Sequence, residues 1–123
     1  MKKHTVPPLP NPHSLERMVE TFKALADPTR AQIVLILANT EQSVNEIVVQ
    51  LQVQQSTVSR HLGVLRAANI VKTRREANRI YYRLTNSHVA DLARQAFSHA
   101  EHGRLGLPDH TNLEVDAVKT RHE

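Results

Sequence analysis

The sequence of 123 residues has no cysteine and no tryptophan. The absence of cysteine excludes disulfides, thiolate metal sites and cysteine nucleophiles. Aromatic residues make up only 3% of the chain, so we expect a core of Leu, Ile, Val and Ala. The longest apolar stretch, residues 31–38, is interrupted by Gln32 and falls far short of the roughly 20 residues that cross a bilayer. The first residues lack the apolar segment of a secretory signal, and we therefore expect a cytoplasmic protein without a membrane partner.

The positions of proline and glycine predict one folded domain between two tails. Four of the six prolines precede residue 13, which predicts a flexible arm over residues 1–13. Gly103, Gly106 and Pro108 interrupt helix formation, so residues 103–123 are expected to form a flexible tail. The intervening residues 14–102 are sufficient for a single hydrophobic core.

Basic residues are concentrated in one segment of the chain. Residues 54–85 contain seven Lys and Arg residues and a single acid, Glu76, whereas the whole chain has a net charge of only +4. A solvated surface normally mixes both signs of charge. A basic segment on a near-neutral body is typical of proteins that bind nucleic acid.

Apolar periodicity predicts four helices before residue 69. Ser14 is placed to cap the first helix, and Asp27 followed by Pro28 suits the N-cap and first position of the second. Ser43 and Glu46 have the spacing of a capping box that opens the third helix.

The period changes after the fourth helix, which is expected over about residues 55–68. Residues 70–75 and 79–84 are typical of short strands, joined as a hairpin by residues 76–78. A fifth helix is expected over residues 87–102, with Asn86 as its N-cap and Gly103 as its stop. The order α-α-α-α-β-β-α predicts a mainly α fold with a small β-hairpin wing, a winged helix-turn-helix.

The fourth helix and the hairpin carry the candidate DNA contacts. Small hydroxyl and amide side chains on the outer face of a helix fit the major groove, which is ~12 Å wide. The residues suited to base edges and nearby phosphates are Gln55, Ser56, Thr57, Ser59, Arg60 and His61. The hairpin residues suited to phosphates or the minor groove are Arg74, Arg75 and Arg79. Capping of the helix by Ser56 or Thr57, and an ordinary surface position for His61, are the alternatives.

Three histidines share one side of the predicted fifth helix: His88, His99 and His102. At about 100° per residue, position 99 lies about 20° from position 88, and position 102 about 40° to its other side. Neutral imidazole is a good ligand for nickel, cobalt and zinc. The alternative is a solvated stripe of histidines without a ligand.

Distance prevents one helix from closing such a metal site. Eleven residues of helix rise about 16 Å, whereas each ligand must lie about 2 Å from the ion. An antiparallel copy of the helix, crossing near residues 94–95, brings His88 of one chain to His99 and His102 of the other. The metal-ligand hypothesis therefore predicts a homodimer with two symmetry-related sites.

Two motifs resemble the ArsR/SmtB family of metal-sensing repressors: residues 22–30, FKALADPTR, and residues 56–65, STVSRHLGVL. Residues 74–84 are similar to the wing of that family, and the resemblance covers about residues 15–102. It implies a homodimeric transcriptional repressor, not an enzyme, which binds an inverted-repeat operator in double-stranded DNA and dimerises through its terminal helices. Some members have a Cys-x-Cys in the third helix, which this chain lacks.

The last helix and the residues after it resemble the nickel- and cobalt-sensing branch of the family. The ligands that this resemblance implies are His88, Glu101, His102 and His110, with a further histidine where this chain has Thr111. The zinc pattern of the family has an aspartate where this chain has Asn86. The resemblance therefore implies Ni²⁺ or Co²⁺ as the effector, with Zn²⁺ second.

We accordingly expect a metal-responsive repressor that a divalent cation releases from operator DNA. The alternative is a repressor of the same family that responds to another signal. A metal-dependent hydrolase is disfavoured, because the sequence shows no Ser/His/Asp constellation and the histidines lie on a surface helix.

Overall fold

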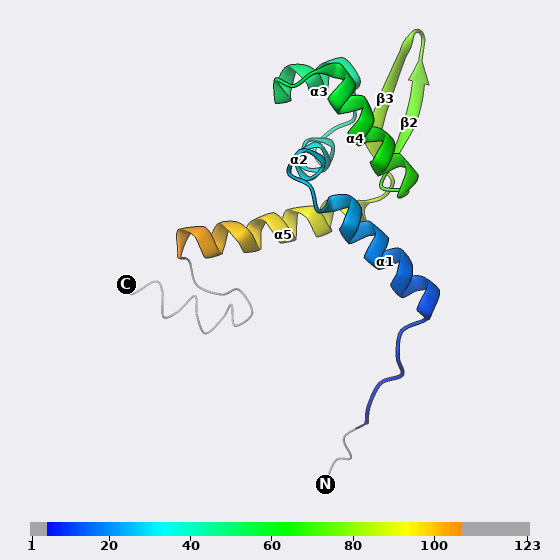
Figure 1. Ribbon diagram of the computed structural model, residues 1–123, viewed down its shortest axis with the longest axis vertical. Helices are drawn as coiled ribbons and strands as arrows, with labels where there is room; N and C mark the ends of the chain where they lie inside the picture. The colour runs from blue at the N-terminus through cyan, green and yellow to red at the C-terminus, as the bar shows by residue number, and fades with distance from the viewer. Residues whose placement is uncertain (1–4, 107–123) are drawn as a thin grey trace.

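The computed structural model of the protein describes residues 5–106, which form five helices and three short strands (Figure 1). The elements are, in chain order, α1 (Pro12–Leu25), α2 (Pro28–Leu37), β1 (Gln42–Ser43), α3 (Val44–Leu51), α4 (Gln55–Ala67), β2 (Val71–Glu76), β3 (Arg79–Leu84) and α5 (Ser87–Leu105). This order confirms the predicted mainly helical fold with a hairpin wing, and adds one strand, β1, that the sequence did not predict.

Side-chain caps fix the beginnings of α1, α2 and α3. The Asn11 side chain accepts hydrogen bonds from the backbone N–H groups of His13 at 2.9 Å and Ser14 at 3.3 Å, so Asn11 and not Ser14 is the N-cap of α1. Helix α1 thus begins at Pro12, because proline has no N–H to leave unpaired at the first helical position. Asp27 accepts from the Arg30 N–H at 3.0 Å, as predicted for the N-cap of α2.

The predicted capping box is confirmed at the beginning of α3. The Glu46 N–H donates to the Ser43 hydroxyl at 3.2 Å, and the Ser43 N–H donates to the Glu46 carboxylate at 2.9 Å. Helix α3 ends at Leu51, and its C-cap Gln52, with a φ of 57° in the left-handed region, turns the chain sharply toward α4. Gln54 is the N-cap of α4 without a side-chain hydrogen bond, so the alternative role of Ser56 or Thr57 as cap is wrong.

The hairpin forms the larger part of a three-stranded antiparallel sheet of order β1-β3-β2. Strands β2 and β3 pair from Val71 opposite Leu84 to Glu76 opposite Arg79. Strand β1 pairs with the other edge of β3, with Gln42 opposite Tyr82. The wing is therefore attached to the chain just before α3 as well as to the end of α4.

The core is aliphatic, as the composition predicted. Helices α2, α3 and α4 and the base of the wing supply the side chains with almost no exposed surface, which are Ile33, Val34, Ile47, Val58, Leu62, Leu65, Ile70 and Val71. Two aliphatic side chains of α5, Val89 and Ala93, pack against the edge of this core. The core therefore lies behind α4 and leaves the opposite side of that helix free.

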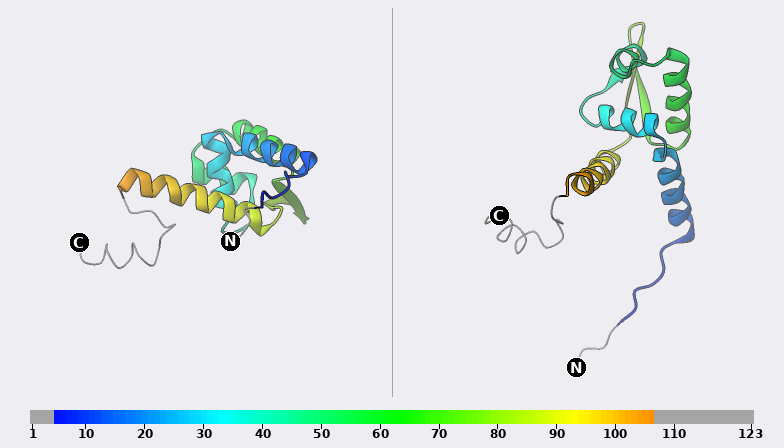
Figure 2. Two further views of the ribbon diagram at one scale, coloured as in Figure 1. Left: turned by 90° about the horizontal axis from the view of Figure 1, so that it is seen from below. Right: turned by 60° about the vertical axis from the view of Figure 1, so that its left-hand side comes forward.

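Helix α5 extends away from the body formed by α2, α3, α4 and the wing (Figure 2). The Asn86 side chain caps it by accepting from the Val89 N–H at 3.2 Å, as predicted. The helix continues through Gly103, where the sequence predicted its end, and stops at Gly106, whose φ of 70° is left-handed. A single glycine inside a helix is only about 1 kcal/mol less favourable than alanine, so Gly103 does not have to end α5. No helix within residues 5–106 is long and apolar enough to cross a membrane.

Candidate nucleic-acid interface and histidine helix

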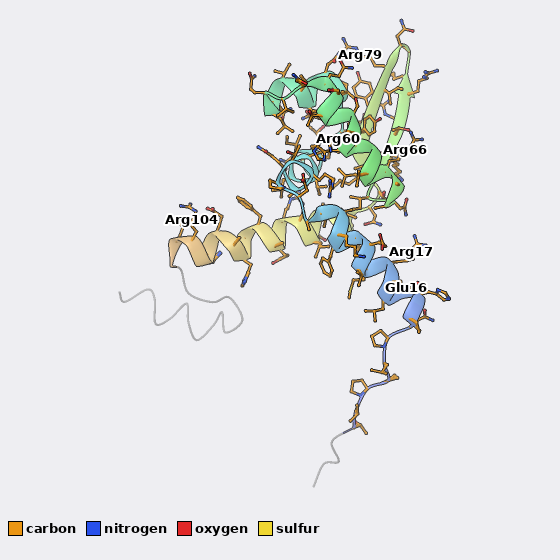
Figure 3. The ribbon with its side chains drawn as sticks, viewed as in Figure 1. Glu16, Arg17, Arg60, Arg66, Arg79 and Arg104 are labelled. Atoms are coloured by element: carbon orange, nitrogen blue, oxygen red, sulfur yellow. The ribbon has the colours of Figure 1, made fainter. Side chains whose placement is uncertain are left out.

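The outer side of α4 presents the polar side chains that the sequence predicted. Gln55, Ser56, Ser59 and Arg60 are exposed, and Thr57 is half-buried. Figure 3 shows Arg60 on α4, far from Arg104 near the free end of α5. Because the apolar side of α4 is covered by the core, its outer side is available to enter a groove of DNA.

His61 does not belong to this outer side. Its exposed fraction is only 6%, and it follows the buried period of Val58, Leu62 and Leu65 along α4. The Arg30 guanidinium donates from Nη1 to the Nδ1 of His61 at 3.3 Å. The prediction of His61 as a DNA-facing residue is therefore wrong, since its ring lies between α4 and the α1–α2 junction.

The wing places two of its three predicted arginines in solvent. Arg75 and Arg79 are exposed next to the turn at residues 77–78, and Figure 3 shows Arg79 on the same side of the molecule as Arg60. Long, exposed arginines near a hairpin tip can reach phosphates that α4 does not contact.

Arg74 is half-buried and is paired with two carboxylates instead. Its guanidinium donates from Nε to Glu41 at 3.0 Å, from Nη2 to the same carboxylate, and from Nη1 to Glu76 at 3.0 Å. It also lies 4.9 Å above the ring centre of Tyr81. The hydrogen bonds from Arg74 lower the pKa of Glu41, and the two carboxylates raise the pKa of Arg74. The predicted phosphate contact by Arg74 would require these bonds to break.

The pairing of Arg74 with Glu41 could not be predicted from any sequence motif. Glu41 lies 33 residues before Arg74, outside both the basic segment and any recognisable motif. Only the pairing of β1 with β3 brings the two residues together.

The histidines of α5 lie on its surface. His88 and His99 are exposed, and His102 is half-buried. The Nδ1 of His102 lies 2.7 Å from the Ser98 carbonyl oxygen, which can only accept, so Nδ1 is the protonated nitrogen. In the neutral ring the lone pair is then on Nε2, which is the nitrogen able to accept a metal ion.

Glu101 is engaged by a neighbour on the same helix. Arg104 donates to its two carboxylate oxygens at 2.9 and 3.0 Å, and these hydrogen bonds lower the pKa of Glu101. A metal ion would have to compete with Arg104 for this carboxylate. His110, the remaining predicted ligand, lies outside the described residues.

Within residues 5–106 of one chain, no three His, Asp or Glu side chains come together to hold a metal ion. The rise of α5 between His88 and His102 explains this separation. A metal site built on this helix must therefore take ligands from another source, such as the antiparallel second copy that the sequence analysis required.

The terminal helices have apolar surface that the single chain leaves uncovered. Helix α1 exposes Leu15, Met18, Val19 and Phe22 by 40–48%, and α5 exposes Phe97 by 53%. Phe22 and Phe97 border an apolar hollow of about 320 Å³ between α1, α2 and α5, which Leu35 and Leu92 also line. Contiguous apolar surface of this kind is typical of a protein–protein interface.

Comparison with known proteins assigns the family. Residues 27–73, which contain α2, α3, α4 and the beginning of the wing, match the family described as bacterial regulatory protein, arsR family. The HTH-type transcriptional regulator KmtR of Mycobacterium tuberculosis is 46% identical over 93 residues, which is 76% of this chain and 72% of KmtR. The chain belongs to the ArsR family. The HTH-type transcriptional repressor SmtB of Mycobacterium tuberculosis is 38% identical over 96 residues, 78% of this chain and 71% of SmtB.

A solved structure confirms the fold of the ArsR family in this chain. The homodimeric winged helix-turn-helix DNA-binding domain from Mycobacterium bovis superposes with a TM-score of 0.72 at 31% identity, covering 80% of this chain and 91% of that domain. The protein is accordingly a transcriptional repressor of the ArsR/SmtB family, and not an enzyme.

Proposed function

We propose that the protein binds operator DNA as a homodimer and that a divalent cation releases it, with Ni²⁺ or Co²⁺ favoured and Zn²⁺ second. The observation that carries this proposal is the placement of histidines on α5, with His88 exposed in its first turn and His99 exposed in its second half, on a helix that projects from the body. The residues proposed to face DNA are Gln55, Ser56, Thr57, Ser59, Arg60, Arg75 and Arg79.

The homodimer is supported by the uncovered apolar surface of α1 and α5. Residues such as Met18, Phe22 and Phe97 are each about half exposed in the single chain, although they are large and apolar. Burying apolar surface stabilises an interface by roughly 25 cal/mol per Å². A twofold dimer through these helices also places two α4 helices for two half-sites, which successive major grooves present about 34 Å apart.

The metal site is proposed to form between the two α5 helices. His88 of one chain would lie near His99 and His102 of the other, with Glu101 and His110 as further candidate ligands. The donor set fits nickel, cobalt and zinc, because it consists of imidazole nitrogens and a carboxylate. The Asn86 side chain is already used as the cap of α5, which agrees with a ligand set that differs from the zinc pattern of the family.

Release follows if the metal favours an arrangement of the two copies that differs from the DNA-bound one. A coupling free energy of about 1–3 kcal/mol per ion changes operator affinity by roughly 5- to 150-fold. Since both α4 helices must meet their half-sites together, a small rotation about the α5 crossing is sufficient to lose contacts at both.

The test uses a duplex selected from a random library by the metal-free protein. We expect NiCl₂ or CoCl₂ to lower the affinity for this duplex in fluorescence anisotropy, and His88→Ala to bind it normally without being released. His13→Ala is the matched control, because His13 is also an exposed histidine but lies on α1. If the metal releases His88→Ala from the duplex as it releases the wild type, the metal site is not on α5.

A second candidate function is a repressor of the same family that does not sense metal. It is favoured by the Glu101–Arg104 pair, which occupies a candidate ligand. Equilibrium dialysis distinguishes the two functions: retention of one Ni²⁺ or Co²⁺ per chain supports metal sensing, and retention of none supports the second candidate.

A further inference from the structure

The buried side of the DNA-reading helix carries one polar residue among aliphatic ones. Four side chains of α4 are buried: Val58, His61, Leu62 and Leu65. Burying an imidazole in place of a leucine has a free-energy cost unless the ring is hydrogen-bonded. A leucine at this position would need no hydrogen-bond partner. The histidine at the centre of α4 therefore indicates a function that an aliphatic side chain cannot perform.

The partner of His61 is Arg30, in the first turn of α2. Arg30 Nη1 lies 3.3 Å from His61 Nδ1, and a guanidinium can only donate, so Nδ1 accepts and the ring carries its proton on Nε2. The Asp27 carboxylate lies 3.8 Å from the same Nδ1. The N–H of Arg30 donates to Asp27, which lowers the pKa of that carboxyl and keeps it ionised.

Arg30 also reaches the end of α1. Its Nε donates to the Ala24 carbonyl oxygen at 2.6 Å, near the last turn of that helix. One guanidinium thus joins the end of α1, the beginning of α2 and the buried side of α4. The two motifs that mark this sequence, residues 22–30 and residues 56–65, meet at this contact.

The Arg30–His61 hydrogen bond can restrain the rotation of α4 about its own axis, in addition to the apolar packing of that helix. Burial of aliphatic side chains is non-directional, so the hydrophobic effect itself prefers no particular angle between α4 and its neighbours. A hydrogen bond prefers a narrow range of distance and angle. Among the residues that the structure describes, His61 makes the one side-chain hydrogen bond recorded for α4. It is adjacent to Arg60, so a rotation of α4 displaces the two residues together.

We propose that His61 is a positioning residue for DNA recognition: its hydrogen bond with Arg30 sets the rotation at which α4 presents Ser59 and Arg60 to base edges. The contact thereby determines how strongly the protein prefers its operator to other DNA. This inference rests on the proposed use of α4 as the DNA-reading helix, but it does not depend on metal release.

The test compares two variants that differ in hydrogen bonding. In His61→Asn, the side-chain oxygen can accept from Arg30 close to the position of Nδ1, whereas His61→Leu fills the space without an acceptor. The measurement is the ratio of affinities for the selected duplex and for a scrambled duplex of the same length. We expect His61→Leu to reduce the ratio by about tenfold, equivalent to one base-specific contact, and His61→Asn to keep it within about twofold of wild type.

A purely structural role for His61 would change stability without changing this ratio. Ile33→Val is the matched control, because Ile33 is fully buried on α2 close to Arg30 and loses one methylene group. We expect Ile33→Val to lower the melting temperature and to leave the ratio unchanged. An unchanged ratio in folded His61→Leu would overturn the proposal.

Arg30→Met provides a second route to the same contact if His61→Leu does not fold. We expect Arg30→Met to reduce the ratio by about tenfold, because it removes the donor and leaves Nδ1 of His61 without its partner. An unchanged ratio in folded Arg30→Met would overturn the proposal. If α4 does not read DNA, Arg60→Ala will leave the ratio of affinities at the wild-type value. This result distinguishes failure of the proposed function from failure of the proposed role of His61.

Discussion

Arg74 on β2 donates from Nε to the carboxylate of Glu41 at 3.0 Å and joins the wing to the segment before β1. The bond is half-buried at both ends and is supplemented by Glu76 and by the ring of Tyr81. This attachment restrains the wing relative to the segment before β1, so the exposed Arg75 and Arg79 project from a hairpin that is fixed at its side.

The three wing arginines are expected to contribute differently to the salt dependence of operator binding. Arg75→Ala or Arg79→Ala should reduce the slope of log affinity against log salt by about one, because each removes a phosphate contact. Arg74→Ala should change the slope less, because its charge is already paired. Anisotropy titrations from about 50 to about 200 mM salt measure these slopes. An equal change for all three variants would show that Arg74 leaves Glu41 on binding DNA.

Arg60→Ala is expected to weaken binding to the selected duplex by about 1–3 kcal/mol, the value of one base-edge contact. Arg66→Ala is the control on the same helix, because it removes an equal charge nearly two turns further along (Figure 3). We expect Arg66→Ala to weaken binding to all duplexes equally, or not at all. Equal behaviour of the two variants would exclude Arg60 from base recognition.

Phe97→Asp should convert the proposed dimer into a monomer. The substitution places a charge on the apolar surface of α5, where a desolvated carboxylate without a partner is strongly unfavourable. Sedimentation equilibrium should show the loss of the dimer, and operator affinity should fall by about tenfold or more, because the two half-sites are no longer bound together. Val49→Asp introduces the same charge at an exposed valine of α3 and should remain dimeric.

Acid should remove the stability that Glu46 contributes. The hydrogen bonds with Ser43 lower the pKa of Glu46 below its ordinary 4.5, so the unfolded chain binds a proton more readily than the folded one. The contribution is thus complete above that value and is lost as the pH falls through the lower folded value. Urea unfolding should show a gap in the free energy of unfolding between wild type and Glu46→Gln at about pH 7, and this gap should shrink as the pH falls below 4.5. Glutamine keeps the capping box, so a constant gap would contradict this cause.

The sequence was sufficient for the fold because local signals agreed with one another. The N-caps at Asp27, Ser43 and Asn86 and the change of period after α4 each specify a boundary from within a few residues. Two of the errors at helix ends, at Ser14 and Gly103, arose where a competing signal was stronger. Pro12 was assigned to the arm although it suits the first turn of a helix, and Gly103 was given more weight than one internal glycine has.

The candidate site was less predictable, because contacts distant in the chain decide it. The burial of His61 was available in principle, since it lies three residues after Val58 and four before Leu65 on the buried period of α4. Its partner Arg30, and the Glu41 that holds Arg74, lie 31 and 33 residues away and follow from tertiary packing alone. The interpretation of α5 as a metal-binding helix stays a prediction.

The placement of the two tyrosines gives the protein an intrinsic optical reporter. Both Tyr81 and Tyr82 are on β3, the chain has no tryptophan, and the Tyr81 ring lies against the Arg74 guanidinium. Ultraviolet emission from the unlabelled protein therefore arises from the wing. A change in tyrosine emission on adding DNA would therefore report binding at this hairpin without a dye. Ions bound at the far end of α5 would change the emission only if their binding altered the structure of the wing.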